Sequence, residues 1–523
     1  MADNFTKQKD FSLETIEIVK PLQGGGYETY SLVSKLCELT IYQDIFNSVL
    51  SGKVVLLDSS DILSTIPLTG NEFLRVGIKY PDTSLTRLLD STLSFAEPIE
   101  GLISDLDSLL SKVDFNDIFG GLGSFVGGFL QDFIQANVPA LPSIKNLFST
   151  VLGLTDFKRK TQWHLFRIYK ADNSQKIGDN AKLETLRLIS PEYVWNLQTK
   201  FNRNFQKESI SSIVAAYFTE LKQFFEDTHP EIYAEKLKQD ALTIEETSGV
   251  FNFASIQANP FNMINGFCNR AISNLDNSTN FVFFQNNVGF NFRSLASIFS
   301  QQNSLQFFCK NPNIAEDKQQ AFSLNALAFE ALNRLQSFDT INNLREGLYG
   351  SRLLSVDPLR KKWYKKDYKL SEEFFKYISS SGNAGDSQLQ IESNYEGMDQ
   401  INARQMLLLS SKGHDTEPYL KALDPSLVDH QVESVAQLRT SQLQLLQQAK
   451  TYIRVPGHPS INAGLKCSFN MPNFSVLDVI AKNKYLQGSY VITACAHHIS
   501  TTKYDIEAEL VKSDFYSKIN FGG

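Results

Sequence analysis

The sequence predicts an α+β fold in which β-rich portions alternate with helical and mixed segments. Apolar and polar residues alternate between positions 73 and 80, which is typical of a half-buried strand. Leucines then recur at helical spacing from 85 to 113, and strand patterns return at 161–192 and after 451. Because 523 residues are too many for one ordinary core, we expect two to four domains.

Composition and charge exclude several classes of protein. The net charge is −7, and the densest basic cluster is Lys361-Lys362 with Lys365-Lys366, so a sequence-specific DNA reader is not expected. The five cysteines are scattered without a CxxC pair, which argues against a disulfide framework and against a zinc site. No apolar run of about 20 residues indicates a membrane span. The 39 phenylalanines fit either a Phe-rich core or subunit interfaces.

The N-terminal portion, 11–80, has the pattern of antiparallel strands. Apolar runs at 39–46 and 53–62 are divided by a turn, and Thr-Gly-Asn precedes a strand that ends at Tyr80. In that strand the even positions, including Leu74 and Val76, are expected to face a core. Residues 81–160 are rich in Leu, Phe and Gly at helical spacing, so we predict a helical insertion before the strands at 161–170 and 181–192.

The middle of the chain is predicted to be mixed. Apolar residues from Ile210 to Phe224 form a helical stripe, a second helix follows Pro260, and FVFFQNNVGFNF at 281–292 is typical of a hairpin. Residues 315–340 are predicted to be helical. The polar segment 379–401 is predicted to be a loop or linker, and 434–450 a helix.

The stretch YIRVPGHPSINAG, 452–464, poses the question of a binding or catalytic histidine. Pro456-Gly457 favours a type II turn between two strands, and Pro459 stiffens its far side. His458 is therefore expected on an exposed loop, without a nearby acidic residue to orient it. We interpret the stretch as a chain reversal rather than as a catalytic or metal site.

Two further features lie near the C-terminus. His497-His498 falls in a strand, so the two imidazoles point to opposite faces and one is expected to be packed and the other exposed. In YDIEAELVK, 504–512, the apolar residues face a core while Asp505, Glu507 and Glu509 face the other way. That acidic face would suit solvent, or a channel that must not hold nucleic acid.

Four stretches in order resemble one known family, the baseplate central hub proteins of contractile-tailed bacteriophages, which are related to the hubs of contractile injection systems. The stretch 38–78 is similar to the family's first tube-like strands, and WHLFRIYK at 163–170 to the strand that follows them. The helix and hairpin at 260–295 resemble the family's middle domain, and 453–514 its closing barrel. No single motif is diagnostic, and the ordered set carries the resemblance.

The resemblance implies an α+β fold with two antiparallel tube-like β-barrel domains, a mixed α/β middle domain and helical insertions. The expected boundaries are 1–80 with 161–190 for the first barrel, 81–160 for a helical insertion, 191–340 for the middle domain, 341–370 with 451–523 for the second barrel, and 371–450 for a helical or loop insertion.

The family's function is structural. The resemblance implies a homotrimeric symmetry adaptor in which six barrels form a ring that joins the six-fold tail tube to the three-fold central spike. Expected partners are the spike, tail tube, baseplate wedge and tape measure proteins, and DNA passes through without specific binding. The protein would be assembled in the host cytoplasm into the tail baseplate of the virion, with no membrane partner and no cofactor or metal. If the last strand lines the channel, Asp505, Glu507 and Glu509 would keep the lumen negative and assist genome ejection.

Two alternatives stay open at this point. The chain could be the hub of a tailocin or of a secretion-type injection machine, or a hub that carries cell-wall hydrolase activity. A hydrolase needs paired carboxylates across a cleft or an activated nucleophile, and no GxSxG, HExxH or phosphate-binding loop is present. We therefore expect no enzymatic activity and assign no catalytic residue.

Overall fold

The computed structural model describes most of the chain, apart from its two ends and several internal segments. The described residues are 11–22, 26–59, 66, 68–81, 159–177, 181–275, 278–309, 326–329, 331–336, 339–358, 361–370, 402–409, 432–446, 450–470 and 488–512. The predicted helical insertion at 81–160 and the predicted linker at 379–401 lie almost entirely outside these residues.

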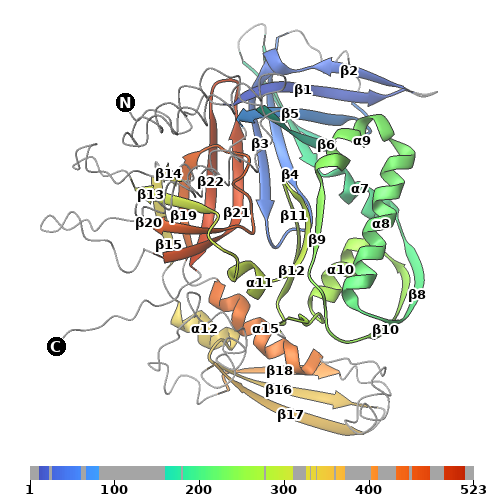
Figure 1. Cartoon of the computed structure of the whole chain (residues 1–523), viewed down its shortest axis with the longest axis vertical. Helices are drawn as coiled ribbons and strands as arrows, with labels where there is room; N and C mark the ends of the chain where they lie inside the picture. The colour runs from blue at the N-terminus through green and yellow to red at the C-terminus, as the bar shows by residue number, and fades with distance from the viewer. Residues whose placement is uncertain are drawn as a thin grey trace, which may run out of the picture.

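A 14-stranded sheet dominates the described structure, and it is built from two modules (Figure 1). The front module consists of β1 (Ser12–Pro21), β2 (Tyr27–Ser31), β3 (Leu36–Asp44), β4 (Ser51–Asp58), β5 (Phe73–Pro81), β6 (Arg159–Lys176) and β7 (Lys182–Ile189), with the short helix η1 (Val33–Lys35). The rear module consists of β13 (Leu305–Cys309), β14 (Ala326–Phe329), β15 (Ala331–Gln336), β19 (Lys450–Pro456), β20 (Lys466–Asn470), β21 (Gly488–Ile499) and β22 (Tyr504–Lys512).

The front module forms because its strands alternate apolar and polar residues. In β5, Leu74, Val76 and Ile78 are buried in the main core, as the alternation predicts. The odd position Phe73 is buried as well, because the opposite face of this strand is covered by the middle region of the chain. The strands pair in the order β3-β4-β7-β6-β5-β1-β2, and every pair is antiparallel.

The rear module corrects one prediction. The sequence pattern predicts a helix at 315–340, but the structure has β14 and β15 there, with β13 parallel to β14 and β15 antiparallel to β19. The short repeat of Leu and Ala at 325–335 fits a helix as well as a strand. Pairing with the distant strand β19 decides between them, as the register Ala331–Arg454 shows.

The two modules join edge to edge through β3 and β21, which pair antiparallel from Leu39–Ile499 to Asp44–Ala494. Figure 1 shows the blue front strands beside the red rear strands at this seam. Core side chains from both modules belong to one continuous cluster, so the join is apolar as well as hydrogen-bonded. The described structure is mostly β-sheet with helices, consistent with the predicted α+β class, while closure into two barrels stays a prediction.

A middle region packs against one face of the front module. It contains α7 (Pro191–Gln198), β8 (Phe201–Glu208), α8 (Ile210–Thr228), α9 (Pro230–Gln239), β9 (Ala241–Ile244), β10 (Phe251–Ala258), α10 (Pro260–Cys268), β11 (Phe281–Asn286), β12 (Gly289–Ser294) and α11 (Leu295–Phe299). Its core is rich in phenylalanine, which favours the Phe-rich-core interpretation of the composition. The helix after Pro260 and the hairpin at 281–292 are confirmed, whereas Phe224 is 39% exposed and Phe225 is buried in its place.

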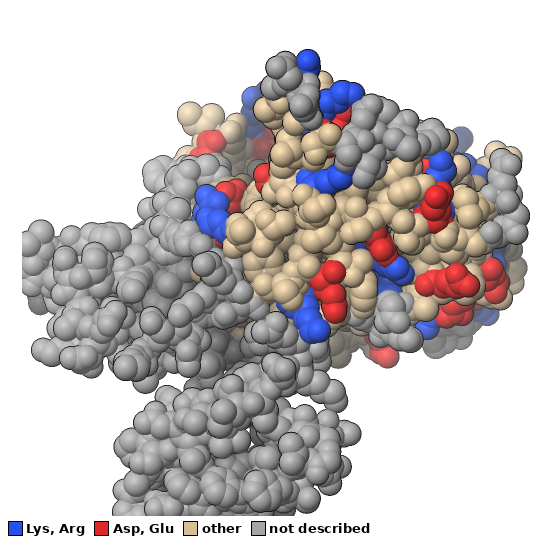
Figure 2. Space-filling model, turned by 90° about the horizontal axis from the view of Figure 1, so that it is seen from above, with Lys and Arg blue, Asp and Glu red and all other residues tan. Residues whose placement is uncertain are grey.

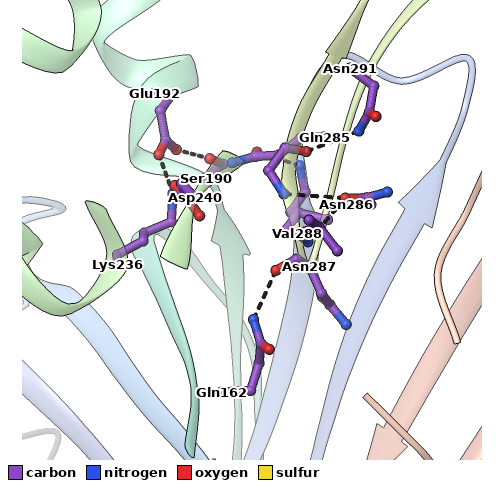
Figure 3. A network of polar contacts seen from close by, with 12 residues as sticks. Gln162, Ser190, Glu192, Lys236, Asp240, Gln285, Asn286, Asn287, Val288 and Asn291 are labelled. Carbon is purple, nitrogen blue, oxygen red and sulfur yellow. Dashed lines mark hydrogen bonds and ion pairs between the residues drawn. The ribbon is translucent and has the colours of Figure 1, made fainter. Parts of the chain in front are cut away.

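Polar contacts fix this region to both modules (Figure 3). The Gln285 side chain accepts a hydrogen bond from the Leu50 backbone N–H of the front module at 3.1 Å. The Asn286 amide donates to the Ala463 carbonyl of the rear module at 3.1 Å. The β11–β12 hairpin therefore contacts both modules close to where they join. Nearby, Lys236 is buried between the carboxylates of Glu192 and Asp240.

The segment assigned to the second barrel at 341–370 is placed differently in the structure. There, β16 (Gly350–Asp357) and β17 (Lys362–Lys369) form a separate three-stranded sheet with β18 (Arg404–Leu409). One face of this sheet is covered by α12 (Thr340–Glu346) and α15 (Val432–Leu446), where Gln437 donates to the Ser351 carbonyl. The rear module uses β13, β14 and β15 instead, from a part of the chain where the resemblance implies the middle domain.

The loop that contains His458 is buried, which corrects two predictions. His458 is only 8% exposed, and its ring contacts the ring of Tyr80 from the front module edge to face. The Pro456-Gly457 turn is also wrong, because Pro456 ends β19 and the chain reverses at Pro459, where the Ile461 N–H donates to the His458 carbonyl at 3.0 Å. Gly457 is required for a different reason: a Cβ there would lie 2.1 Å from the ring of Tyr504.

Candidate functional site

The candidate site is a broad sheet surface rather than a cleft. Directly opposed residues of antiparallel strands share a face, and the register opposes Lys53 to Thr40, Thr40 to His498, and His498 to Asp505. These side chains lie on the face turned away from the core. We name it the shared-sheet face: the outward side chains of β6, β7, β4, β3, β21, β22 and β19, which run across both modules.

The three carboxylates predicted for the last strand lie on this face in different surroundings. Asp505 is 2% exposed and accepts ion pairs from Arg454 at 2.9 Å and Lys503 at 2.5 Å. Glu507 has 53% of its side chain exposed and lies opposite Arg454. Glu509 has only 12% of its side chain exposed. The acidic strand is thus real, but basic neighbours accompany it, and whether this face lines a channel stays a prediction.

Glu509 is held ionised by its neighbours. It accepts hydrogen bonds from Thr493 at 2.6 Å and Tyr452 at 2.5 Å, and it pairs with Lys450 at 3.1 Å. Burial opposes ionisation of Glu509, but these hydrogen bonds outweigh it and keep the pKa of the carboxyl below its usual value. Burial, together with the negative Glu509, raises the pKa of Tyr452 to about 12.

A second set of polar contacts crosses the seam between the modules. His498 Nδ1 lies 2.8 Å from Glu38 Oε1, and the Thr40 hydroxyl donates to the same oxygen at 2.8 Å. The hydrogen bond from His498 lowers the pKa of Glu38 despite partial burial, and the positive Lys53 lowers it further. On the other side, His498 Nε2 lies 3.8 Å from a Glu507 oxygen. The histidine therefore links a front-module carboxylate with a rear-module carboxylate.

In the front module, Lys170, Arg187 and Lys53 lie opposite one another in register, and carboxylates lie beside them. Asp172 on β6 pairs with Lys170 at 2.6 Å and with Arg187 of β7 at 2.5 Å. Hydrogen bonds from these two cations lower the pKa of Asp172. Tyr42, 37% exposed, lies between the charged groups of the two modules, opposite Ala496 and Ser51.

His497 lies beneath the face, in the core, as the alternation predicts for one of the two histidines. It is 1% exposed, and burial lowers its pKa to about 3. The Gln43 amide donates to its Nε2 at 3.1 Å, so Nδ1 carries the proton and donates to the Tyr504 hydroxyl at 2.8 Å. Gln43 also receives the Ala463 N–H at 3.0 Å. This buried network ties β3, β21, β22 and the His458 loop together, and sequence spacing gives no signal for it.

The described residues were compared with the requirements of a metal site and of a membrane span. Within them, no group of three or more His, Cys, Asp or Glu side chains is arranged to hold a metal ion. Nor does any helix among them have the length and apolarity to cross a bilayer. A cavity of about 260 Å³ opens beside Glu509, with walls that include Phe46, Leu443 and Leu446.

Comparison with known proteins gives structural neighbours only. No protein family and no curated protein sequence matches the chain. Among solved structures, it is similar to a tail protein from Neisseria meningitidis MC58, with a TM-score of 0.44 and 8% identity over 97% of this chain and 98% of that one. It is also similar to the 43 kDa tail protein of prophage MuSo2 from Shewanella oneidensis, with a TM-score of 0.39 and 8% identity over 96% and 100% of the two chains.

A third neighbour comes from a secretion system. The E. coli c3393 protein, described as a component of the type VI secretion system similar to the T4 tail proteins gp27 and gp5, matches with a TM-score of 0.37 and 7% identity. The match covers 97% of this chain and 77% of that chain. The structural neighbours are thus phage-tail and secretion-system proteins, and the likeness extends over nearly the whole of this chain.

Proposed function

We propose that this chain is a structural subunit of a phage-type tail, and more specifically its baseplate hub. The observation that supports this most is the β3–β21 seam, an antiparallel pairing that makes one chain present two β-modules as a single continuous sheet. Three copies of such a chain supply six modules, so a three-fold assembly can match a six-fold tube on one side and a three-fold spike on the other.

Closure of the rear module into a barrel is part of this proposal. Its pairings run β13-β20-β21-β22-β19-β15, and β14, which pairs with β13, is separated from β15 by only residue 330. A chain that continues from β14 into β15 would bring the two ends of this path together. Closing a sheet removes the unpaired edges that otherwise invite unspecific association.

The proposed role is contact and not catalysis, with the shared-sheet face toward the channel. The partners in this proposal are two further copies of the chain, the spike, the tail tube, and the wedge and tape measure proteins. DNA would pass along the face without specific binding. In the phage case the chain would reside in the tail baseplate of the virion.

The mass of the particle in solution tests the proposal. We would measure the purified 59.0 kDa chain by light scattering, alone and mixed with a spike protein from the same genome. The expected result is a particle of three chains, formed alone or on addition of the spike. A spike protein from an unrelated tail is the control. An inert monomer under both conditions would refute the hub function.

A further inference from the structure

We propose that the shared-sheet face lets duplex DNA pass by masking its own cations with paired carboxylates, rather than by repelling DNA with net negative charge. This inference rests on the hub function, because it takes DNA as the polyanion that moves along the face. It concerns the chemistry of the face itself, however, and the isolated chain is enough to test it.

The first argument is that cations and carboxylates occur together on and beside the face, although Lys170, Arg187 and Lys53 lie opposite one another in register. The cations are Lys53, Lys170, Arg187, Lys450, Arg454 and Lys503, and the carboxylates are Glu38, Asp44, Asp172, Asp505, Glu507 and Glu509. Lys503 lies in the turn just before β22, beside Asp505.

The second argument is proximity, because the charges are paired at contact distance. Asp172 and Asp505 each hold two cations, all at 2.9 Å or less. Lys450 contacts Glu509 at 3.1 Å, and Lys53 lies close enough to Glu38 to lower its pKa. Each cation of the set therefore has a carboxylate beside it.

Paired charges have a short reach. The Debye length at physiological ionic strength is about 8 Å. At larger distances the electric field of paired opposite charges acts only weakly on a phosphate group of the DNA. Unpaired lysines and arginines would instead capture phosphates and release counterions, which holds DNA in place. A face of net negative charge would repel DNA and raise the barrier to its entry. Pairing each cation with a carboxylate avoids both the capture and the repulsion of DNA.

Charges of both signs also occur on the surface seen from above the molecule. On the described part of that surface, basic and acidic side chains are interspersed, without a continuous field of either sign (Figure 2). This differs from our sequence-based expectation of a negative lumen, which considers one strand alone. The basic partners of Asp505 and Glu509 come from β19 and from the turn before β22, and the strand's own sequence pattern does not place them.

Two carboxylates can be removed without cutting into the core. Glu38 and Glu507 have 41% and 53% of their side chains exposed. They flank His498 and lie near Lys53 and Arg454. The double variant E38Q/E507Q keeps the shape of both side chains, removes the carboxylate near Lys53 and leaves Arg454 with Asp505 alone. The matched control is E226Q/E231Q, which removes the same charge from exposed positions on α8 and α9, where Glu226 also lies near a lysine.

The experiment measures binding of a fluorescent DNA duplex by anisotropy over a range of salt concentrations. We expect the wild-type chain to bind weakly and E38Q/E507Q to bind about tenfold more tightly at low salt. Its plot of log K against log salt should steepen by about 0.9 if Lys53 alone contacts a phosphate and by about 1.8 if Arg454 does so as well, since each neutralised phosphate contributes about 0.9. Adding Lys53→Gln to the double variant should reverse part of the gain.

Three results would overturn the masking proposal. They are tight DNA binding by the wild type, no gain in E38Q/E507Q, and an equal gain in E226Q/E231Q, which would show an effect of net charge only. Circular dichroism of each variant reports whether it is folded. The hub function is refuted by a different result, namely a monomer that does not bind the spike. A trimer whose DNA affinity is unchanged in E38Q/E507Q would refute masking alone.

Discussion

Gly457→Ala probes the buried loop on which the junction of the two modules depends. The new Cβ would lie 2.1 Å from Cγ and Cδ2 of Tyr504, so the ring must move by more than an ångström. That ring is 1% exposed, and its hydroxyl accepts the only proton of the neutral His497 ring. The substitution therefore strains the core and separates Tyr504 from His497.

The magnitude follows from these two effects. Overpacking a well-filled core costs about 1–3 kcal/mol, and leaving the buried His497 N–H without an acceptor costs about 1–3 kcal/mol more. We expect Gly457→Ala to lower the free energy of unfolding by about 2–6 kcal/mol, measured in urea by circular dichroism. Gly266→Ala is the control, because a Cβ at that position in α10 would meet nothing within 4 Å and alanine favours a helix. A loss at Gly457 within about 0.5 kcal/mol of zero, the range of a surface substitution, would refute the reasoning.

Buried charges and the absence of a catalytic motif supply the remaining predictions. Lys236→Met leaves the buried Glu192 and the partly buried Asp240 without their cation and should cost about 3–5 kcal/mol in urea unfolding; the exposed Lys222→Met should cost less than about 1 kcal/mol. Burial lowers the pKa of His164 to about 4 and of His497 to about 3. A peptidoglycan clearing assay should show no activity, and a cleared zone from purified protein would contradict the structural role.

The sign of the histidine effect is fixed by linkage. Below about pH 6.5 the two histidines bind protons in the unfolded chain but not in the folded chain. The free energy of unfolding is therefore highest above that pH and falls as the pH drops toward the pKa values of the folded state. Between pH 7 and pH 5 the two histidines together should remove about 4 kcal/mol, at 1.36 kcal/mol for each unit of pH and each group. In His497→Gln about half of this dependence should vanish. An unchanged slope in that variant would show that other groups control it.

Local patterns in the sequence predict local structure here. Alternation in β5 and β22, the stripe of α8 and the hairpin at 281–292 need only neighbouring residues, and the structure has them. His497 and His498 are likewise separated correctly into a buried and a partly exposed side chain. The period of the pattern is a property of each strand or helix alone, so it can be read without the rest of the fold.

The wrong predictions concern residues whose structure depends on contacts with distant parts of the chain. His458 looks like a loop residue because its neighbours are Pro and Gly, yet it is buried and its ring contacts Tyr80 of the front module. Residues 326–336 become strands because β13 and β19 pair with them. The Lys450 and Arg454 partners of the acidic strand lie more than 50 residues from it. A single sequence holds no signal for such contacts.

The seam between β3 and β21 has a consequence for synthesis on the ribosome. Thr40 and His498 are neighbours in the sheet but stand 458 residues apart in the chain. At about 5–20 residues per second, the edge of β3 waits roughly half a minute or longer before β21 emerges. During that interval the unpaired edge of β3 in the nascent front module can pair with other nascent chains. Chaperones would then be needed to keep front modules on neighbouring ribosomes apart.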